Sequence, residues 1–119
     1  MSERTGLRVL LVEDEAVIAF ALEDMLDELG YHVVGPAFRL EEALLLVKDE
    51  AFDAAILDVN LNEQRSYAVA DELNRRGVPF LFATGYAEGG VQWDGRAVDV
   101  LAKPYRRDQI DAALRRLLS

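Results

Sequence analysis

Acidic, hydroxyl and amine side chains stand just after four of the short apolar runs in this chain of 119 residues. They are Glu13, Asp14 and Glu15 after the first run, Asp58 after the third, Thr84 after the fourth and Lys103 after the fifth. Taken singly, each is explained as a helix cap, a turn residue or an exposed loop residue. If the runs are neighbouring strands, however, these groups meet in one crevice, and capping does not explain that convergence.

Converging carboxylates predict a cation site. Carboxylates about 5 Å apart repel by roughly 3 kcal/mol per pair at an effective dielectric near 20, so a cation is needed to hold all of them ionised. The candidate metal ligands among these residues are all oxygen atoms, which favours Mg²⁺ over Mn²⁺ or Ca²⁺. A lysine charge and a threonine hydroxyl beside that ion complement a phosphoryl group. Asp58 is then the expected nucleophile, because carboxylates form acyl phosphates.

The elements that must position these groups are short apolar strands and longer segments of helical period. The runs of strand length are Arg8–Val12, His32–Val34, Ala54–Leu57, Pro79–Ala83 and Val98–Leu101. Helical spacing predicts helices around Ile18–Leu29 with a stop at Gly30, Ala43–Val47, Val69–Leu73 with a stop at Gly77, and Ile110–Leu118. A further helix, over residues 87–96, contains three glycines and is expected to be short, irregular or mobile.

This alternation predicts an α/β fold, a doubly wound five-stranded parallel sheet with five helices. No Pro-, Gly- or Ser-rich linker divides the chain. Residues 1–119 are therefore expected to form a single domain, with a loose tail at 1–6. Ligand sites of such sheets lie beyond the carboxyl ends of the strands, where the strand order reverses. The polar residues that follow the apolar runs stand at that edge.

Composition excludes several classes of function. The chain has no cysteine, so thiol nucleophiles, zinc–thiolate sites and disulfides are ruled out. No stretch of about 18 consecutive apolar residues is present, so no membrane span is expected and a cytoplasmic location is the natural default. The formal net charge of -9 disfavours binding to nucleic acid or to an anionic membrane.

Four motifs carry a family resemblance. In order and spacing, the stretches "LLVEDE" (Leu10–Glu15), "AAILDVNL" (Ala54–Leu61), "LFATG" (Leu81–Gly85) and "LAKPY" (Leu101–Tyr105) resemble those of the receiver domain of two-component response regulators. The resemblance covers essentially the whole chain and implies a flavodoxin-like sheet with receiver topology. The stretches "PFLFATGY" and "KPY" are similar to the Phe-Ala-Thr-Gly signature subgroup of alphaproteobacterial receivers.

The resemblance assigns a role to each acid of the site. Asp58 resembles the phospho-acceptor, and Glu13 and Asp14 resemble the acidic pair that binds Mg²⁺. Asn60 resembles the residue whose main-chain carbonyl completes the metal site.

The loop that follows Asn60 departs from the family pattern, with Asn62, Glu63 and Ser66 where receivers often have Pro-Gly and a later Gly. It is expected to be more mobile, or shaped for another partner.

Further positions resemble the family's switch. Thr84 resembles the hydroxyl that turns towards the phosphoryl group, and Lys103 resembles the lysine that contacts it. Pro104 resembles the following proline, whose preceding peptide is usually cis in this family. Most receivers carry Tyr or Phe three residues before the lysine, but Val100 stands here. Tyr86 is the nearest aromatic that could replace that ring; the alternative is that Tyr86 only packs nearby or gates access to the site.

The resemblance implies a phospho-accepting switch of a two-component system or phosphorelay. The donor would be a phosphohistidine of a histidine kinase or histidine phosphotransfer protein. Phosphorylation would change the face formed by the fourth helix and fifth strand and so control an unknown output protein. The protein is expected to be a monomer or weak homodimer, and to promote only its own phosphorylation and dephosphorylation.

Three alternatives stay open on the sequence. The chain could be a receiver-fold interaction module that never uses phosphate, or a phosphate sink. It could also be a small phosphohydrolase that acts on outside substrates. Such enzymes commonly carry a second acid two residues after the nucleophile, and Asn60 occupies that place, which argues against turnover.

Overall fold

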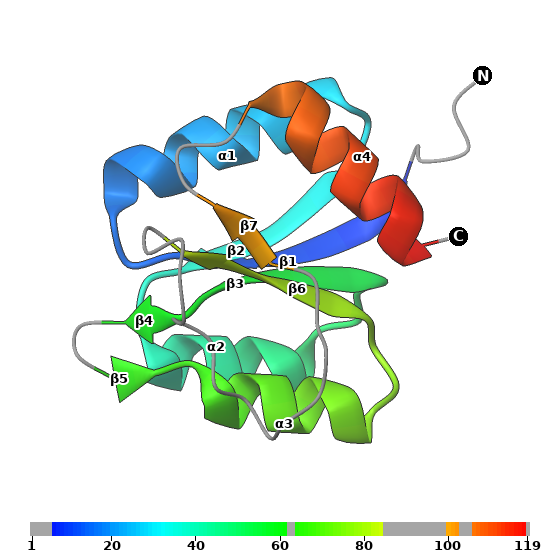
Figure 1. Cartoon of the computed structure of the whole chain (residues 1–119). Helices are drawn as coiled ribbons and strands as arrows, with labels where there is room; N and C mark the ends of the chain where they lie inside the picture. The colour runs from blue at the N-terminus through cyan, green and yellow to red at the C-terminus, as the bar shows by residue number, and fades with distance from the viewer. Residues whose placement is uncertain (1–5, 62–63, 85–99, 103–105, 119) are drawn as a thin grey trace.

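A five-stranded parallel sheet organises the chain (Figure 1). The computed structural model describes residues 6–61, 64–84, 100–102 and 106–118. The strand order is β2-β1-β3-β6-β7, and every neighbouring pair is parallel. The strands are β1 (Arg8–Val12), β2 (His32–Ala37), β3 (Ala54–Asp58), β6 (Phe80–Thr84) and β7 (Val100–Ala102). The order reverses at β1 and β3, so their carboxyl ends flank the predicted ligand crevice.

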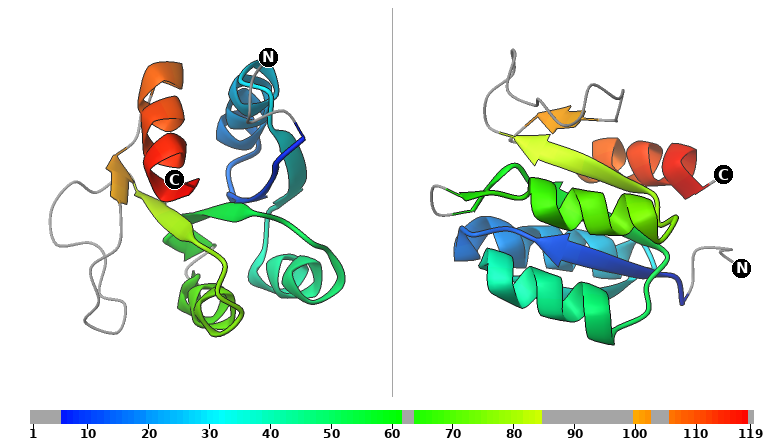
Figure 2. Two further views of the ribbon diagram at one scale, coloured as in Figure 1. Left: turned by 90° about the vertical axis from the view of Figure 1, so that its right-hand side faces the viewer. Right: turned by 90° about the horizontal axis from the view of Figure 1, so that it is seen from below.

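Helices cover both faces of the sheet. In the part of the chain that the structure describes they are α1 (Ala16–Glu28), α2 (Leu40–Asp49), α3 (Tyr67–Arg75) and α4 (Arg107–Leu118). Helices α1 and α4 lie on one face, and α2 and α3 on the other (Figure 2). The predicted α/β fold with a five-stranded parallel sheet is confirmed. The further helix predicted over residues 87–96 lies outside the described residues.

Strands β1 and β3, whose carboxyl ends carry the acids of the site, are rigidly packed because both of their faces are buried. All five residues of β3 are buried, and so are the last four of β1. Side chains alternate between two apolar clusters: Leu10 and Val12 face the α2–α3 layer, while Val9 and Leu11 face the α1–α4 layer. Each fully buried leucine or valine contributes about 1.5–3 kcal/mol. The strand ends that carry the acids are thereby fixed in place.

Strand β2 is longer than the sequence predicts. We expected it to end at Val34, but it continues through Gly35 and Pro36 to Ala37, and the Gly35–Pro36 peptide is cis. An edge strand tolerates proline because the N–H that proline lacks is not required on its open side. The predicted third and fourth strands stopped one residue early, so Asp58 and Thr84 are strand residues and not the residues after strands.

A small hairpin follows β3, formed by β4 (Asn60–Leu61) and β5 (Gln64–Arg65). The sequence predicted only a loop in this place. Among the described residues, no helix is long and apolar enough to cross a membrane.

Candidate functional site

The predicted acids meet at the carboxyl edge of the sheet. Strands β1 and β3 are neighbours, and Val12 pairs with Leu57, so Glu13 and Asp58 lie level with each other. Asp14 is the next residue of the chain. One carboxylate oxygen from each of Glu13, Asp14 and Asp58 lies within 4.8 Å of the other two. Among the residues that the structure describes, this is the one group of three or more acids or histidines close enough to share a metal ion.

The burial of these acids strengthens the electrostatic repulsion between their ionised carboxylates. Glu13 is 1% exposed and Asp58 is 6% exposed, while Asp14 is half-buried. At the separations found here, each pair of ionised carboxylates repels by roughly 3 kcal/mol at an effective dielectric of 20. A divalent cation would offset that repulsion. The cluster therefore has the charge and the ligand type of a Mg²⁺ site.

Glu13 is held at both its main chain and its side chain. Its backbone N–H donates to the carbonyl of Ala37 at 2.9 Å. Its carboxylate accepts a hydrogen bond from the backbone N–H of Glu15 at 3.1 Å, and Glu15 is the N-cap residue directly before α1. The positive end of the α1 dipole thus faces the acidic cluster. The capping explanation for Glu13 is partly right, since its side chain binds an amide at the helix start.

The carboxylates of Glu13, Asp14 and Asp58 offer oxygen ligands, the type that Mg²⁺ prefers, and a bound Mg²⁺ usually keeps several waters. Asn60, whose main-chain carbonyl is the remaining predicted ligand, lies in β4 two residues after Asp58 and pairs with Arg65. The hairpin is tied to the end of β3, because the N–H of Ser66 donates to the carbonyl of Val59 at 2.9 Å.

The predicted switch residues fall only partly within the described structure. Asp58 pairs with Ala83 across β3 and β6, so Thr84 lies one residue beyond the level of Asp58 on the adjacent strand. Thr84 in turn pairs with Ala102 at the end of β7. Val100 pairs with Phe82, two residues before the end of β7. Lys103, Pro104 and Tyr86 lie outside the described residues, so their roles stay predictions.

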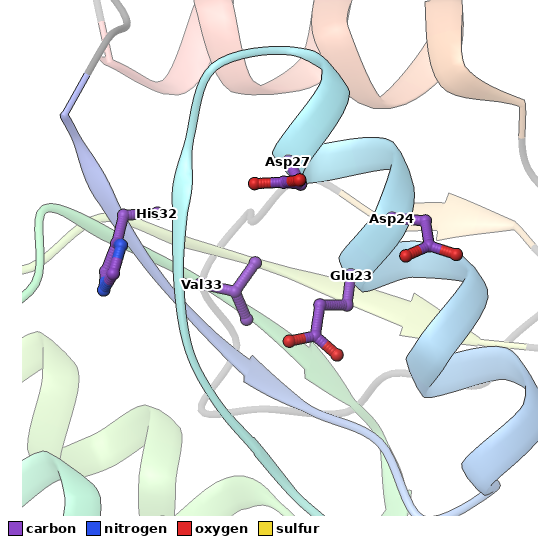
Figure 3. Close-up of a pocket in the computed structure, with 5 residues that line it drawn as sticks. All are labelled: Glu23, Asp24, Asp27, His32 and Val33. Carbon is purple, nitrogen blue, oxygen red and sulfur yellow. The ribbon is translucent and has the colours of Figure 1, made fainter.

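A groove lies away from these acids. It is an open groove of about 410 Å³ lined by Glu23, Asp24, Asp27, His32 and Val33, with the acids on α1 and the other two on β2 (Figure 3). None of the predicted site residues lines it. Its acids do not approach one another closely enough to form a metal-binding group. The groove is therefore not the candidate site.

The β4–β5 hairpin is the element of the site that sequence reasoning missed. Two pairs of residues form it, Asn60 with Arg65 and Leu61 with Gln64. Strands of two residues are too short to show alternation of polar and apolar side chains. The available signal was the asparagine at position 62, a turn-forming residue between two short segments.

Known proteins with a similar sequence and fold belong to one family. The family model described as "Response regulator receiver domain" matches residues 9–115. The structure of SdrG from Sphingomonas melonis Fr1 superposes with a TM-score of 0.84 at 43% identity, with 100% of both chains covered. The receiver domain of sensor histidine kinase PA1611 from Pseudomonas aeruginosa PAO1, solved with magnesium in its active-site cleft, has a TM-score of 0.82 and 28% identity over 96% of this chain and 98% of that one.

Curated relatives are longer than this chain. The transcriptional regulatory protein TcrA of Mycobacterium tuberculosis (strain ATCC 25618 / H37Rv) is 36% identical over 120 residues, which is 95% of this chain and 46% of TcrA. The chain thus spans about half the length of the curated relatives it matches.

Proposed function

Because this chain belongs to the response regulator receiver domain family, we propose that Asp58 accepts the phosphoryl group in its signalling switch. The observation that carries the proposal is the cluster of Glu13, Asp14 and Asp58, whose carboxylates converge within 4.8 Å. Asp58 suits the acceptor role because it ends a fully buried strand and lies beside two further acids. Glu13 and Asp14 precede α1 and suit the role of metal ligands.

Transfer to Asp58 is a displacement at phosphorus. An oxygen of the Asp58 carboxylate forms a bond to phosphorus while the bond from phosphorus to the donor's imidazole nitrogen breaks, and the electron pair of that bond leaves with the imidazole. Mg²⁺, when held by Glu13, Asp14, Asp58 and the Asn60 carbonyl, would supply positive charge that offsets the charge of acceptor and phosphoryl oxygens. The buried setting of Asp58 restricts the positions that its carboxylate can take during the transfer.

Two exposed apolar side chains suit contact with the phosphoryl donor. Val17 is 84% exposed and Phe20 is 52% exposed, and both lie in the first turns of α1, next to the acidic cluster. Exposed apolar surface beside a functional site can serve as a protein contact. We assign this surface to the histidine kinase or histidine phosphotransfer protein that would present phosphohistidine.

Phosphorylation would act on the β6–β7 side of the crevice. A phosphoryl group adds about -1.5 to -2 charge and strong acceptor oxygens. Thr84 and Lys103 are the groups proposed to move towards it and so to change the face formed by the predicted fourth helix and the fifth strand of the sheet. With valine at position 100, Tyr86 is the proposed reporter aromatic. An output protein that binds one arrangement would read the state of Asp58.

Labelling with a small phosphodonor tests the proposal. Wild-type protein with acetyl phosphate and Mg²⁺ should gain the mass of one phosphoryl group, and Asp58→Asn should not. Asp24→Asn is the matched control, because it removes the same charge from an exposed position on α1 and should label normally. Undiminished labelling of Asp58→Asn would show that the assignment of Asp58 is wrong. Absence of labelling in all three proteins would favour an interaction module that does not use phosphate.

Turnover of outside substrates is the remaining enzymatic alternative. We propose that the protein promotes only its own phosphorylation and dephosphorylation, since Asn60 places an amide where a general acid would be needed. A screen of phosphate esters for released phosphate should show none above the rate of aspartyl-phosphate decay. Sustained release would identify a phosphohydrolase.

A further inference from the structure

The carboxyl end of edge strand β2 lies against the acid-bearing end of β1. We call residues 35–38 the β2 brace. Along β1 the pairing advances two residues, from Leu10 to Val12, while along β2 it advances three, from Val34 to Ala37. One extra residue is therefore accommodated in β2, as in a β-bulge. Bulges re-aim side chains next to functional sites, and this one ends at the residue level with Val12.

The extra residue keeps Ala37 inside the protein. Side chains of a regular strand alternate, so residues three apart point to opposite faces. Here Val34 and Ala37 are both buried, at 5% and 1% exposed, in the cluster that faces α2 and α3. Ala37 is thus packed in the core, and its carbonyl direction is fixed. That carbonyl accepts the Glu13 N–H at 2.9 Å.

Contacts on both sides hold the end of the brace. The backbone N–H of Phe38 donates to a carboxylate oxygen of Glu42, in the first turn of α2, at 3.0 Å. The ring of Phe38 packs edge-on against Phe20 of α1, with ring centroids 6.0 Å apart. The brace is therefore tied to helices on opposite faces of the sheet.

We propose that the β2 brace is a positioning element for Glu13, acting through the Ala37 carbonyl to set the main chain from which the Glu13 carboxylate reaches the metal site. This inference rests on the proposed function, because it takes Glu13 as a metal ligand. Partners that orient metal ligands without touching the metal commonly change its affinity 10- to 100-fold when they are lost.

Gly35 offers a way to displace the brace. It has a φ of +103°, and a Cβ there would lie 2.9 Å from the Ala37 nitrogen and 3.0 Å from the Leu11 carbonyl oxygen. Both are backbone atoms, so Gly35→Ala must shift the brace or β1. Gly77 is the matched control, since it has a φ of +74° but a Cβ there would meet nothing within 4 Å. Gly77→Ala imposes the same kind of backbone cost after α3, away from the acids.

Titration with Mn²⁺ alone, with free ion counted by electron paramagnetic resonance, gives the affinity of the acidic cluster. We expect Gly35→Ala to bind Mn²⁺ about 10-fold more weakly than wild type, and Gly77→Ala to bind it as wild type does although both lose stability to urea. Saturating metal should restore acetyl phosphate labelling of Gly35→Ala. Unchanged Mn²⁺ affinity in folded Gly35→Ala would overturn the role of the brace and leave Asp58 untouched.

Two further measurements decide the matter if Gly35→Ala does not fold. Phe38→Ala removes the ring contact with Phe20 and should weaken Mn²⁺ binding, by less than Gly35→Ala does. In wild type, the Glu13 amide should exchange with deuterium slowly, as a hydrogen-bonded amide does. Rapid exchange of that amide, or full Mn²⁺ affinity in Phe38→Ala, would overturn the inference. A wild type that binds no Mn²⁺ would instead contradict the metal site of the proposed function itself.

Discussion

The two ends of strands β1 and β3 use charge in opposite ways. At the amino end, the N–H of Arg8 donates to the Asp53 carboxylate at 2.8 Å, and the Arg8 guanidinium pairs with Glu50 at 3.2 Å. At the carboxyl end, Glu13 and Asp58 stand level and gather with Asp14 within 4.8 Å. A hydrogen bond and an ion pair thus stabilise the amino end, whereas three acidic side chains of like charge gather at the carboxyl end.

The difference shows which end of the two strands carries an electrostatic cost in stability. A hydrogen bond from a backbone amide to a carboxylate stabilises a fold by about 1.5–3 kcal/mol. Clustered carboxylates cost free energy unless a cation binds them. The same pair of strands therefore has one end that its own hydrogen bonds and ion pair stabilise, and one end where a bound cation would offset the repulsion. Departures from local rules of stability are expected at functional sites.

The largest effect should come from removing one acid of the cluster. Asp14→Asn takes away repulsion with both neighbours, and with solvent screening of this half-buried group it should raise the free energy of unfolding by about 2 kcal/mol in metal-free buffer. Urea denaturation with EDTA measures this. With Mg²⁺ in excess the advantage should shrink, because the wild type gains more from the metal. A less stable variant in EDTA would mean that the cluster is not strained by its charge.

The amino end should respond in the opposite direction and by less. Asp53→Ala removes the acceptor of the Arg8 N–H. Because this hydrogen bond is exposed to solvent, its loss should lower the free energy of unfolding by only about 1 kcal/mol. Asp53→Asn retains an acceptor oxygen and should lose less. Neither change should alter Mn²⁺ affinity, which serves as the control. An Asp53→Ala protein as stable as wild type would remove the contrast between the two ends.

The buried hydroxyl of Ser66 is a second group that lowers stability near the carboxyl end of β3. It is fully buried, and its hydroxyl has no hydrogen-bond partner among the described residues, although it is the residue before α3. No capping bond is lost on substitution, so Ser66→Ala should stabilise by about 1 kcal/mol, the cost of a buried unsatisfied hydroxyl. Thermal unfolding measures it. A destabilised variant would show that the hydroxyl is in use, and Ser66→Thr would then test whether a hydroxyl alone suffices.

The smallest effect should come from an exposed group of ion pairs on α3, in which Glu72 pairs with Arg75 and Arg76. Side-chain hydrogen bonds from Arg75 and Arg76 lower the pKa of Glu72 below its ordinary value of 4.5. A depressed acid pKa contributes stability that is fully present above pH 4.5 and is lost as the pH falls through the lowered value. Glu72→Gln should therefore lose slight stability at pH 7 and none at strongly acidic pH. A loss independent of pH would assign the effect to packing.

Much of this architecture is predictable because strands that are buried on both faces appear in the sequence as short runs of apolar residues. Strand β3 is apolar up to its last residue, Asp58, because helices cover both of its faces. The rule that ligand sites lie at the carboxyl ends of parallel strands then brings Glu13, Asp14 and Asp58 together. The extension of β2 was missed because Gly35 and Pro36 ordinarily end a strand. Only the tertiary pairing with β1 shows that an edge strand passes through them.

The β4–β5 hairpin was missed for a related reason. Its strands have two residues each, too few for a periodic signal, and their pairing depends on the anchor between Ser66 and Val59. The groove at Glu23 was not foreseen either, since it arises from the spacing between α1 and β2 and not from any motif. The pairing of Thr84 with Ala102 agrees with a shared edge for the proposed switch residues.

Identification of the labelled residue tests the central claim most directly. An aspartyl phosphate is an acyl phosphate, and borohydride reduces it to homoserine. Protein phosphorylated with acetyl phosphate and Mg²⁺, reduced, digested and sequenced by mass spectrometry should contain homoserine at position 58. It should contain none at positions 14 or 53. Homoserine at another position, or phosphate retained on a residue other than Asp58, would contradict the account.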